Sequence, residues 1–149
     1  MKRMASLFFV CLVLLASFSL YASEDTEAIQ NTVTSAYVEG IHIEGNLDKI
    51  RAGFHPDFTM TIMGKDGGLR KVELADWMKR IEEGNKKKTG DEPKPNVEHS
   101  FTLVDHNGNA AVARVELHRD GKHVFTDYLS LYKFENGWKI VAKIFHRHK

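Results

Sequence analysis

Residues 126–145 read TDYLSLYKFENGWKIVAKIF, and this stretch decides the fold. Apolar and polar residues alternate on both sides of Asn136-Gly137, a pair typical of a two-residue turn between antiparallel strands. Two similar pairs, Asn107-Gly108 and Asp120-Gly121, lie upstream at strand-length spacing. From Val97 to the end, the sequence therefore predicts four antiparallel strands joined by tight turns.

Two-residue turns at these three pairs determine which residues face each other, because the side-chain period of a strand is two. The predicted register pairs Leu103 with Val112, Val112 with Leu129, and Leu129 with Ile144. One face of the sheet is then apolar, and we expect helices to cover it. Its further members are Leu131, Ala142, Ile140 and Trp138.

Charged residues continue this face toward one end of the sheet. The predicted register places Asp127 between Arg114 and His146, about 4.8 Å from each neighbouring strand. A carboxylate flanked by a guanidinium and an imidazole can stay ionised, and it favours the protonated histidine. The residues predicted around these three are Phe101, His99, Glu116, Phe125 and His148. We therefore predict a polar pocket at this end of the apolar face.

The opposite sheet face is too apolar and aromatic to be only solvated. It is predicted to carry Thr102, Ala113, Val115, Thr126, Tyr128, Tyr132, Val141 and Phe145. We expect a second copy of the chain to cover this face, which would make the protein a homodimer.

The first half of the sequence has helical spacing. Apolar or small residues recur on one side of a predicted helix over Glu24–Glu44, at Ile29, Val33, Ala36, Tyr37, Gly40 and Ile41. A short helix over Leu47–Ala52, a strand over Phe58–Met63 and a helix over Val72–Glu83 are predicted to follow. The charged stretch over residues 85–95 is predicted to be a solvated loop.

Residues 1–22 have the pattern of a secretory signal peptide, with Lys2 and Arg3 before an apolar run over Leu7–Leu20. This run is shorter than the ~20 residues of a membrane-spanning helix. We expect cleavage after Ala22 and a periplasmic or secreted protein with one domain over residues 23–149, without stable membrane insertion; a retained N-terminal anchor is the alternative. The single cysteine, Cys11, lies in the removed segment, so no disulfide is expected.

Charge and motifs exclude several function classes. The chain has 21 Lys+Arg and 20 Asp+Glu, so we do not expect nucleic-acid binding through a basic surface. His146 and His148 are two residues apart on one predicted strand, but His99 is expected roughly 14 Å away, which leaves them without a third metal ligand. Phosphate-binding loops and nucleophile elbows are absent from the sequence. We expect neither a metal nor a cofactor.

The element order, the HPDF motif at residues 55–58 and the stretch at residues 126–145 resemble the nuclear transport factor 2-like superfamily. Within it, the chain is similar to small secreted bacterial proteins of the lumazine-binding and polyketide cyclase-like kinds. The resemblance implies an α+β cone, in which a curved antiparallel sheet wraps three helices. It also implies a pocket at the open end and dimerisation through the outer sheet face. These motifs specify a fold better than a chemistry.

Three functional hypotheses remain open. The first is an exported binding protein for a small, flat, partly anionic ligand held by Arg114, in a pocket lined by Tyr37, Trp77, Phe101, Glu116 and His99. The second is a cofactor-independent isomerase, dehydratase or hydrolase, because superfamily enzymes use carboxylates, tyrosine or a histidine paired with a carboxylate, and Asp127 and His146 would form such a pair. The third is a non-catalytic dimeric interaction module. In a purely structural alternative, Arg114 and Asp127 form a cross-strand ion pair and Trp77 is a core residue.

Overall fold

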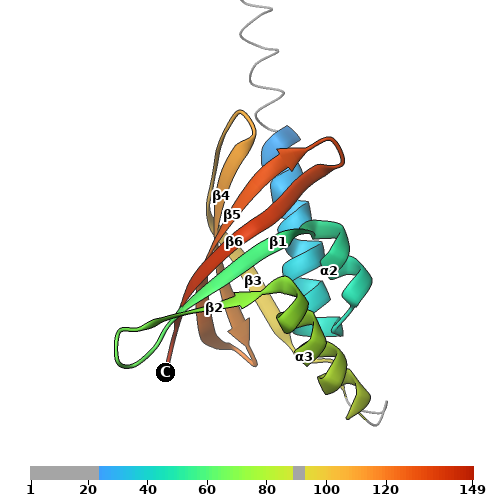
Figure 1. Cartoon of the computed structure of the whole chain (residues 1–149), viewed down its shortest axis with the longest axis vertical. Coiled ribbons are helices and arrows are strands. Elements are labelled where there is room, and N and C mark those ends of the chain that lie inside the picture. The colour runs from blue at the N-terminus through green and yellow to red at the C-terminus, as the bar shows by residue number, and fades with distance from the viewer. Residues whose placement is uncertain (1–23, 89–92) are drawn as a thin grey trace, which may run out of the picture.

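A computed structural model describes residues 24–88 and 93–149, and its helices cover one side of a single sheet (Figure 1). Residues 24–32 are α-helical and continue directly into the π-helix η1, Val33–Glu44. The remaining elements are α2 (Leu47–Gly53), β1 (Phe54–Met63), β2 (Leu69–Glu73), α3 (Leu74–Lys86), β3 (Val97–Asn107), β4 (Ala110–Arg119), β5 (Lys122–Phe134) and β6 (Gly137–Arg147). The predicted signal peptide and Cys11 lie outside the described residues.

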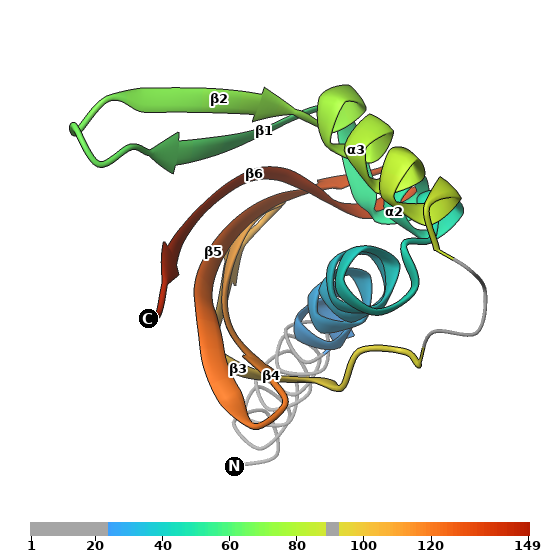
Figure 2. The same cartoon turned by 90° about the horizontal axis from the view of Figure 1, so that it is seen from below.

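The six strands form one curved sheet in the order β2-β1-β6-β5-β4-β3. Neighbouring strands are antiparallel except β1 and β6, which run parallel. Figure 2 shows that the sheet curves around η1, which lies on its concave side, with α2 and α3 beside it. Three helical segments wrapped by a curved, unclosed sheet confirm the predicted α+β cone.

The first helix supplies one wall of the hydrophobic core. Ile29, Val33 and Tyr37 are fully buried, and Ala36 and Gly40 are buried beside them, as the predicted apolar stripe requires. The π-helical part of this helix also sets the relative positions of Tyr37 and His42. Because a π-helix bonds residues five apart, Tyr37 and His42 fall on one face, and their rings make an edge contact at 4.8 Å between centroids.

The short helix α2 connects η1 to the first strand of the sheet. Gly45 takes the left-handed conformation at φ 64° and ends η1, and the Asn46 side chain accepts hydrogen bonds from the first backbone amides of α2. At the other end of α2, a Cβ on Gly53 would collide with the Ala36 side chain. The close approach of the two helices therefore depends on glycine at this position.

Two predicted elements differ from the structure. The first strand begins at Phe54 rather than Phe58, so it includes Pro56 near its start. Val72, predicted to begin a helix, instead lies in β2, and the helix α3 begins at Leu74. The glycine-containing turn at residues 64–68 joins β1 and β2 as a hairpin, in which Met60 pairs with Val72. The helical spacing around Val72 coincides with the alternation of a short strand, which sequence periodicity cannot separate.

The predicted turns are displaced at two of the three hairpins. Asn107 pairs with Ala110 and Phe134 with Gly137, so those turns contain Gly108-Asn109 and Glu135-Asn136. Gly108 occupies the first turn position at φ 59°, and Gly137 follows its turn at φ 100°. At the Asp120-Gly121 turn both residues have positive φ, and the prediction there is confirmed. Glycine can serve either side of a tight turn, so the dipeptide alone does not determine the register.

Bulges move whole rows of side chains to the other face, whereas a two-residue turn displaced by one residue changes the cross-strand partner but not the face. In β4, Ala113, Val115 and Leu117 are buried inside, so the predicted inward orientation of Val112, Arg114 and Glu116 is wrong. In β6, the irregular step that follows Ile140 turns Lys143 and Phe145 inward and leaves Ile144 57% exposed. The predicted inward positions of Leu103, Ile144 and His146 are wrong for the same reason.

Candidate functional site

Three polar side chains meet inside the cone and form the candidate functional site. The Tyr37 hydroxyl donates a hydrogen bond of 2.8 Å to Oδ2 of Asp127. Nζ of Lys143 donates to the Tyr37 hydroxyl oxygen at 2.7 Å and lies 2.8 Å from Oδ1 of Asp127. Tyr37 and Asp127 are completely buried, and Lys143 is 5% exposed. We call Tyr37, Asp127 and Lys143 the polar triad.

The fold brings the triad together from the first helix and from the two consecutive strands of the last hairpin. Tyr37 comes from η1, Asp127 from β5 and Lys143 from β6. Asp127 pairs with Phe145 across the two strands, while Lys143 pairs with Leu129, so the carboxylate and the ammonium meet diagonally. The triad therefore depends on the register between β5 and β6.

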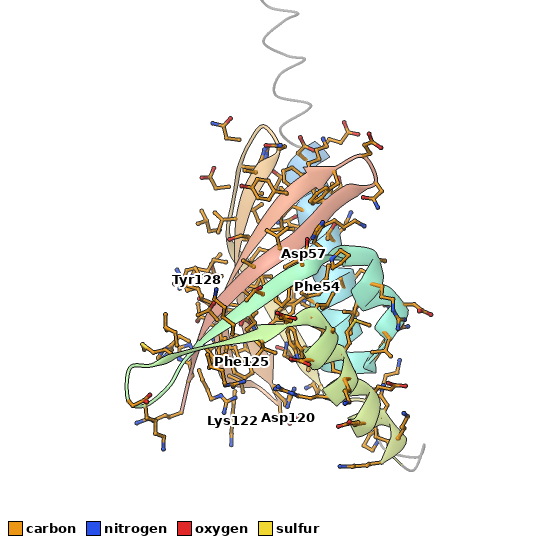
Figure 3. The ribbon with its side chains drawn as sticks, in the orientation of Figure 1. Phe54, Asp57, Asp120, Lys122, Phe125 and Tyr128 are labelled. Atoms are coloured by element: carbon orange, nitrogen blue, oxygen red, sulfur yellow. The ribbon has the colours of Figure 1, made fainter. Side chains whose placement is uncertain are left out.

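Aromatic rings surround the ammonium group. Nζ of Lys143 lies 4.5 Å from the ring centroid of Phe145 and 4.7 Å from that of Tyr37. The rings of Trp77 and Phe125 follow at 5.6 and 5.9 Å. Aromatic faces attract a cation at these distances. In Figure 3, Phe125 lies on the part of the sheet near α3, and it packs against the core. The charge of Lys143 is thus balanced by one carboxylate and four ring faces.

Burial changes the proton affinities in and around the triad. Loss of hydration lowers the pKa of Lys143, and the charge of Asp127 opposes this by raising it. Burial, together with the Asp127 charge, raises the pKa of Tyr37 well above its usual range, so its hydroxyl remains a donor. Burial and the nearby Lys143 charge lower the pKa of His42 to about 3. His42 is therefore neutral near pH 7, and its Nε2 is buried without a hydrogen-bond partner.

A solvent-filled hollow of about 490 Å³ lies next to the triad, between the tip of the β1–β2 hairpin and the end of β6. Its walls include Lys65, Arg70 and Arg147, and none of the described residues that line it is a carboxylate. Phe145 contributes to both places, because it lines the hollow and its ring centroid lies 4.5 Å from Nζ of Lys143. This half-buried side chain therefore connects the basic hollow with the buried triad.

A second hollow, of about 520 Å³, lies at the other side of the helices. Ile43, Glu44, Lys88 and Pro93 are among its walls, and it contacts none of the triad residues. We therefore place the candidate site at the hollow beside Phe145, where solvent space and buried polar groups adjoin.

The predicted site residues divide into two groups. The structure brings Tyr37 and Asp127 into direct contact, with Trp77 at 6.4 Å from Tyr37 between ring centroids. His99 and Phe101 also lie on the concave face, where the His99 ring bonds to the Thr34 hydroxyl of η1. His99 contacts this helix and the ring of Phe101, so the two residues support η1 rather than the triad.

The other predicted residues lie on the outer face. Arg114 forms an ion pair with Glu116 at 3.2 Å and lies over the ring of Tyr128. Tyr128, which Figure 3 labels on the side of the sheet away from the helices, is 40% exposed. His146 pairs with Thr126 and is exposed, and its side chain is separated from Asp127, although it lines the rim of the hollow beside Phe145. The predicted Arg114–Asp127–His146 network is therefore wrong, because the displaced register puts its two basic members on the opposite face from Asp127.

His118, His123 and His148 gather on this outer face instead. Their rings stack at 4.7 and 3.8 Å, and His146 makes an edge contact with His148. The Thr126 hydroxyl bonds to both His123 and His148. Within residues 24–88 and 93–149, no group of three or more His, Cys, Asp or Glu side chains has the geometry to hold a metal ion.

Lys143 is the residue that the sequence prediction missed. A single lysine within IVAKIF, flanked on both sides by apolar residues, is the signal that could have identified it. Simple alternation from Trp138 and Ile140 places Lys143 outside, however, and only the bulge turns it inward. Lys65, Arg70 and Arg147 carried no such signal, because lysine and arginine at strand ends and turns are common on any surface.

A protein-family model matches residues 24–146, and its description is "Putative lumazine-binding". The chain belongs to this family. The prediction of a nuclear transport factor 2-like fold is likewise confirmed. A nuclear transport factor 2-like protein from Shewanella baltica has a TM-score of 0.67 at 23% identity, over 85% of this chain and 96% of that one. A similar protein from Silicibacter pomeroyi also has a TM-score of 0.67, at 21% identity over 85% and 98% of the two chains.

One curated protein is similar to this member of the lumazine-binding family in sequence. It is the aldolase FrzH from Cladobotryum, which is 26% identical over 113 residues, covering 74% of this chain and 82% of that protein. Among the described residues, no helix has the length and apolar character needed to cross a bilayer.

Proposed function

We propose that this protein binds a small, flat, anionic molecule in the hollow beside Phe145. Membership of the lumazine-binding family and the nuclear transport factor 2-like fold point to small-molecule binding. The observation that carries the proposal is the position of Phe145 between three basic side chains and the buried polar triad. A flat ring stacks on Phe145, and its acidic group meets Lys65, Arg70 and Arg147.

The triad supports a functional use of this end of the cone. Burying an ion pair removes two charges from water, and well-packed apolar residues are often as stable or more stable in the same place. Asp127 and Lys143 are nevertheless 0% and 5% exposed. Ligand pockets combine apolar and aromatic walls with a few precisely placed polar groups, and the triad with its surrounding rings has this composition. Anion binding was predicted for Arg114, but Arg114 lies on the outer face. We therefore assign this role to the three basic side chains of the hollow.

Binding can be tested with lumazine-6-carboxylate, a flat fluorescent anion, and with lumazine, which lacks the carboxylate. Fluorescence titration of the full chain should give one site that prefers the carboxylate. Arg70→Ala should weaken the carboxylate probe about tenfold or more, as expected for loss of a charged hydrogen bond, with little effect on lumazine. Arg114→Ala is the matched control, because it removes an arginine from the outer face.

Equal binding of both probes, or equal losses in Arg70→Ala and Arg114→Ala, would contradict the proposed location. Absence of binding by either probe at millimolar concentration would contradict the proposed ligand class.

Proton transfer at a carbon next to a carbonyl is the second candidate function. The predicted Asp127–His146 pair cannot supply it, but Asp127 lies beside Tyr37 and Lys143 and can act as the base. The similarity to an aldolase favours this candidate, since aldol chemistry begins with removal of such a proton. Turnover that survives Asp127→Asn would rule it out.

Export and dimerisation are two further parts of the proposal. Lys2, Arg3 and the apolar run over residues 7–20 support export, which the intact mass of the protein recovered from its host would test. Exposed apolar side chains on the outer sheet face support pairing with a second copy; they are Leu103, Tyr128, Tyr132 and Ile144.

A further inference from the structure

Lys143 has the surroundings of a reactive amine. Its Nζ lies 2.8 Å from a carboxylate oxygen that can take its proton, and 2.7 Å from a hydroxyl. The carboxylate is fully buried, and Oδ2 is already held by Tyr37, so its geometry is fixed. An amine becomes a nucleophile only when it is unprotonated, and the loss of hydration on burial lowers the pKa of Lys143, although the Asp127 charge opposes this.

We propose that Nζ of Lys143 forms an imine with the carbonyl carbon of a small anionic aldehyde or ketone. This inference rests on the binding site proposed above and names its substrate class. The three basic side chains around the hollow select the anion, and the carbonyl end passes Phe145 to reach Nζ. The half-buried Phe145 ring must turn to open this path.

The reaction balances with the groups present. Asp127 takes a proton from the ammonium of Lys143, and the freed electron pair forms the bond to the carbonyl carbon. The carbonyl oxygen receives protons by way of Asp127 and leaves as water, while a carbon–nitrogen double bond replaces the carbon–oxygen one. The product iminium carries one positive charge, as the ammonium did, and it faces the Asp127 carboxylate. Nothing is oxidised or reduced.

Asp127 and Lys143 contact the reacting atoms, whereas Tyr37 is a positioning residue. Its hydroxyl donates to Oδ2, so that Oδ1, which accepts no hydrogen bond from the described residues, is the oxygen left 2.8 Å from Nζ. A further titratable group close to the triad is His42, whose ring lies against Tyr37 and whose lowered pKa keeps it neutral. His42 therefore adds no competing charge when the iminium forms.

Imine formation can be trapped in the full chain with glyoxylate, an anionic aldehyde, and sodium cyanoborohydride, which reduces an imine to carboxymethyl-lysine. Proteolysis and mass spectrometry then locate each adduct. An ordinary lysine, with a pKa of about 10.4, has on the order of one free amine in a thousand near pH 7. Lys143 should be modified at least tenfold faster than Lys122, which is exposed at the β4–β5 turn and serves as the internal reference (Figure 3).

Two further arms test the mechanism. Asp127→Asn should slow the labelling of Lys143 about tenfold. Arg70→Ala should slow labelling by glyoxylate to a similar extent, but it should leave labelling by uncharged formaldehyde unchanged. Between pH 6 and 8 the Lys143 rate should change little, whereas the rate at an ordinary lysine rises about tenfold per pH unit.

Labelling of Lys143 no faster than Lys122 would overturn the inference. If lumazine-6-carboxylate still binds in that case, the proposed binding function stands without the imine. If neither the probe binds nor Lys143 is labelled, both proposals fail. Because the main measurement uses the unaltered protein, it does not depend on any variant folding.

Discussion

Replacing Lys143 with methionine provides the most direct test of the buried triad. Methionine keeps the length and apolar contacts of the lysine stem but removes the charge, so Asp127 is left as a buried carboxylate with one hydrogen bond from Tyr37. Breaking a buried ion pair by removing one partner typically costs about 3–5 kcal/mol, because the remaining charge is uncompensated. The free energy of unfolding of Lys143→Met should fall by this amount.

The double variant Lys143→Met/Asp127→Asn separates the charge from the packing. It removes both charges, while the amide oxygen of the new asparagine can still accept the hydrogen bond from the Tyr37 hydroxyl. A neutral pair of similar shape is commonly no less stable than the ion pair it replaces. The double variant should therefore recover most of the loss and lie within about 1 kcal/mol of the original protein.

Urea unfolding followed by tryptophan fluorescence measures both effects, since the Trp77 ring lies 5.6 Å from Nζ and Trp138 is buried in the core. With a slope of about 2 kcal/mol per molar urea, the midpoint of Lys143→Met should fall by about 1.5–2.5 M. Lys122→Met, at an exposed position, is the control and should change stability by less than about 0.5 kcal/mol.

The reasoning is refuted if Lys143→Met loses less than about 1 kcal/mol, or if the double variant is no more stable than the single one. Should the single variant fail to fold, folding of the double variant alone would still support the argument.

Three more predictions follow from individual contacts. Burial lowers the pKa of His42 from 6.5 to about 3, so the unfolded chain binds more protons than the folded one below pH 6.5. The free energy of unfolding should therefore fall as the pH falls from about 6.5 toward 3. In His42→Phe, the urea midpoint should fall less steeply across this range. Gly53→Ala should lower the free energy of unfolding, measured by urea unfolding, by about 1–3 kcal/mol because its Cβ meets Ala36. Gly84→Ala, in helix α3 where an added Cβ has open space, should instead raise the free energy of unfolding by up to about 1 kcal/mol. Ile144→Lys should convert the proposed dimer to a monomer in sedimentation equilibrium without lowering the unfolding midpoint, since Ile144 is 57% exposed; a dimer that survives this change would locate the interface elsewhere.

Several parts of the molecule follow from local sequence. Periodicity, turn residues and helix caps act over a few neighbouring residues, so they can be seen in the sequence alone. They predict the four C-terminal strands, the short helix α2 and the buried stripe of the first helix. Tyr37 and Asp127 were both identified this way, because one lies in a helical stripe and the other in an alternating strand. The boundary between β2 and α3 was not, since five residues are too few to separate the two periods.

The orientation of the functional side chains depended on tertiary structure. The bulge after Ile140 exchanges the two faces of the rest of β6, and nothing in the local pattern of β6 reveals this bulge. Packing of the whole sheet against η1 decides which face of each strand points inward. For this reason Lys143 lies inside with Asp127, while Arg114 and His146 lie outside. The sequence by itself determined which elements form and which residues are apolar enough to bury; only the assembled sheet decided which charges meet, because register is a long-range property of paired strands.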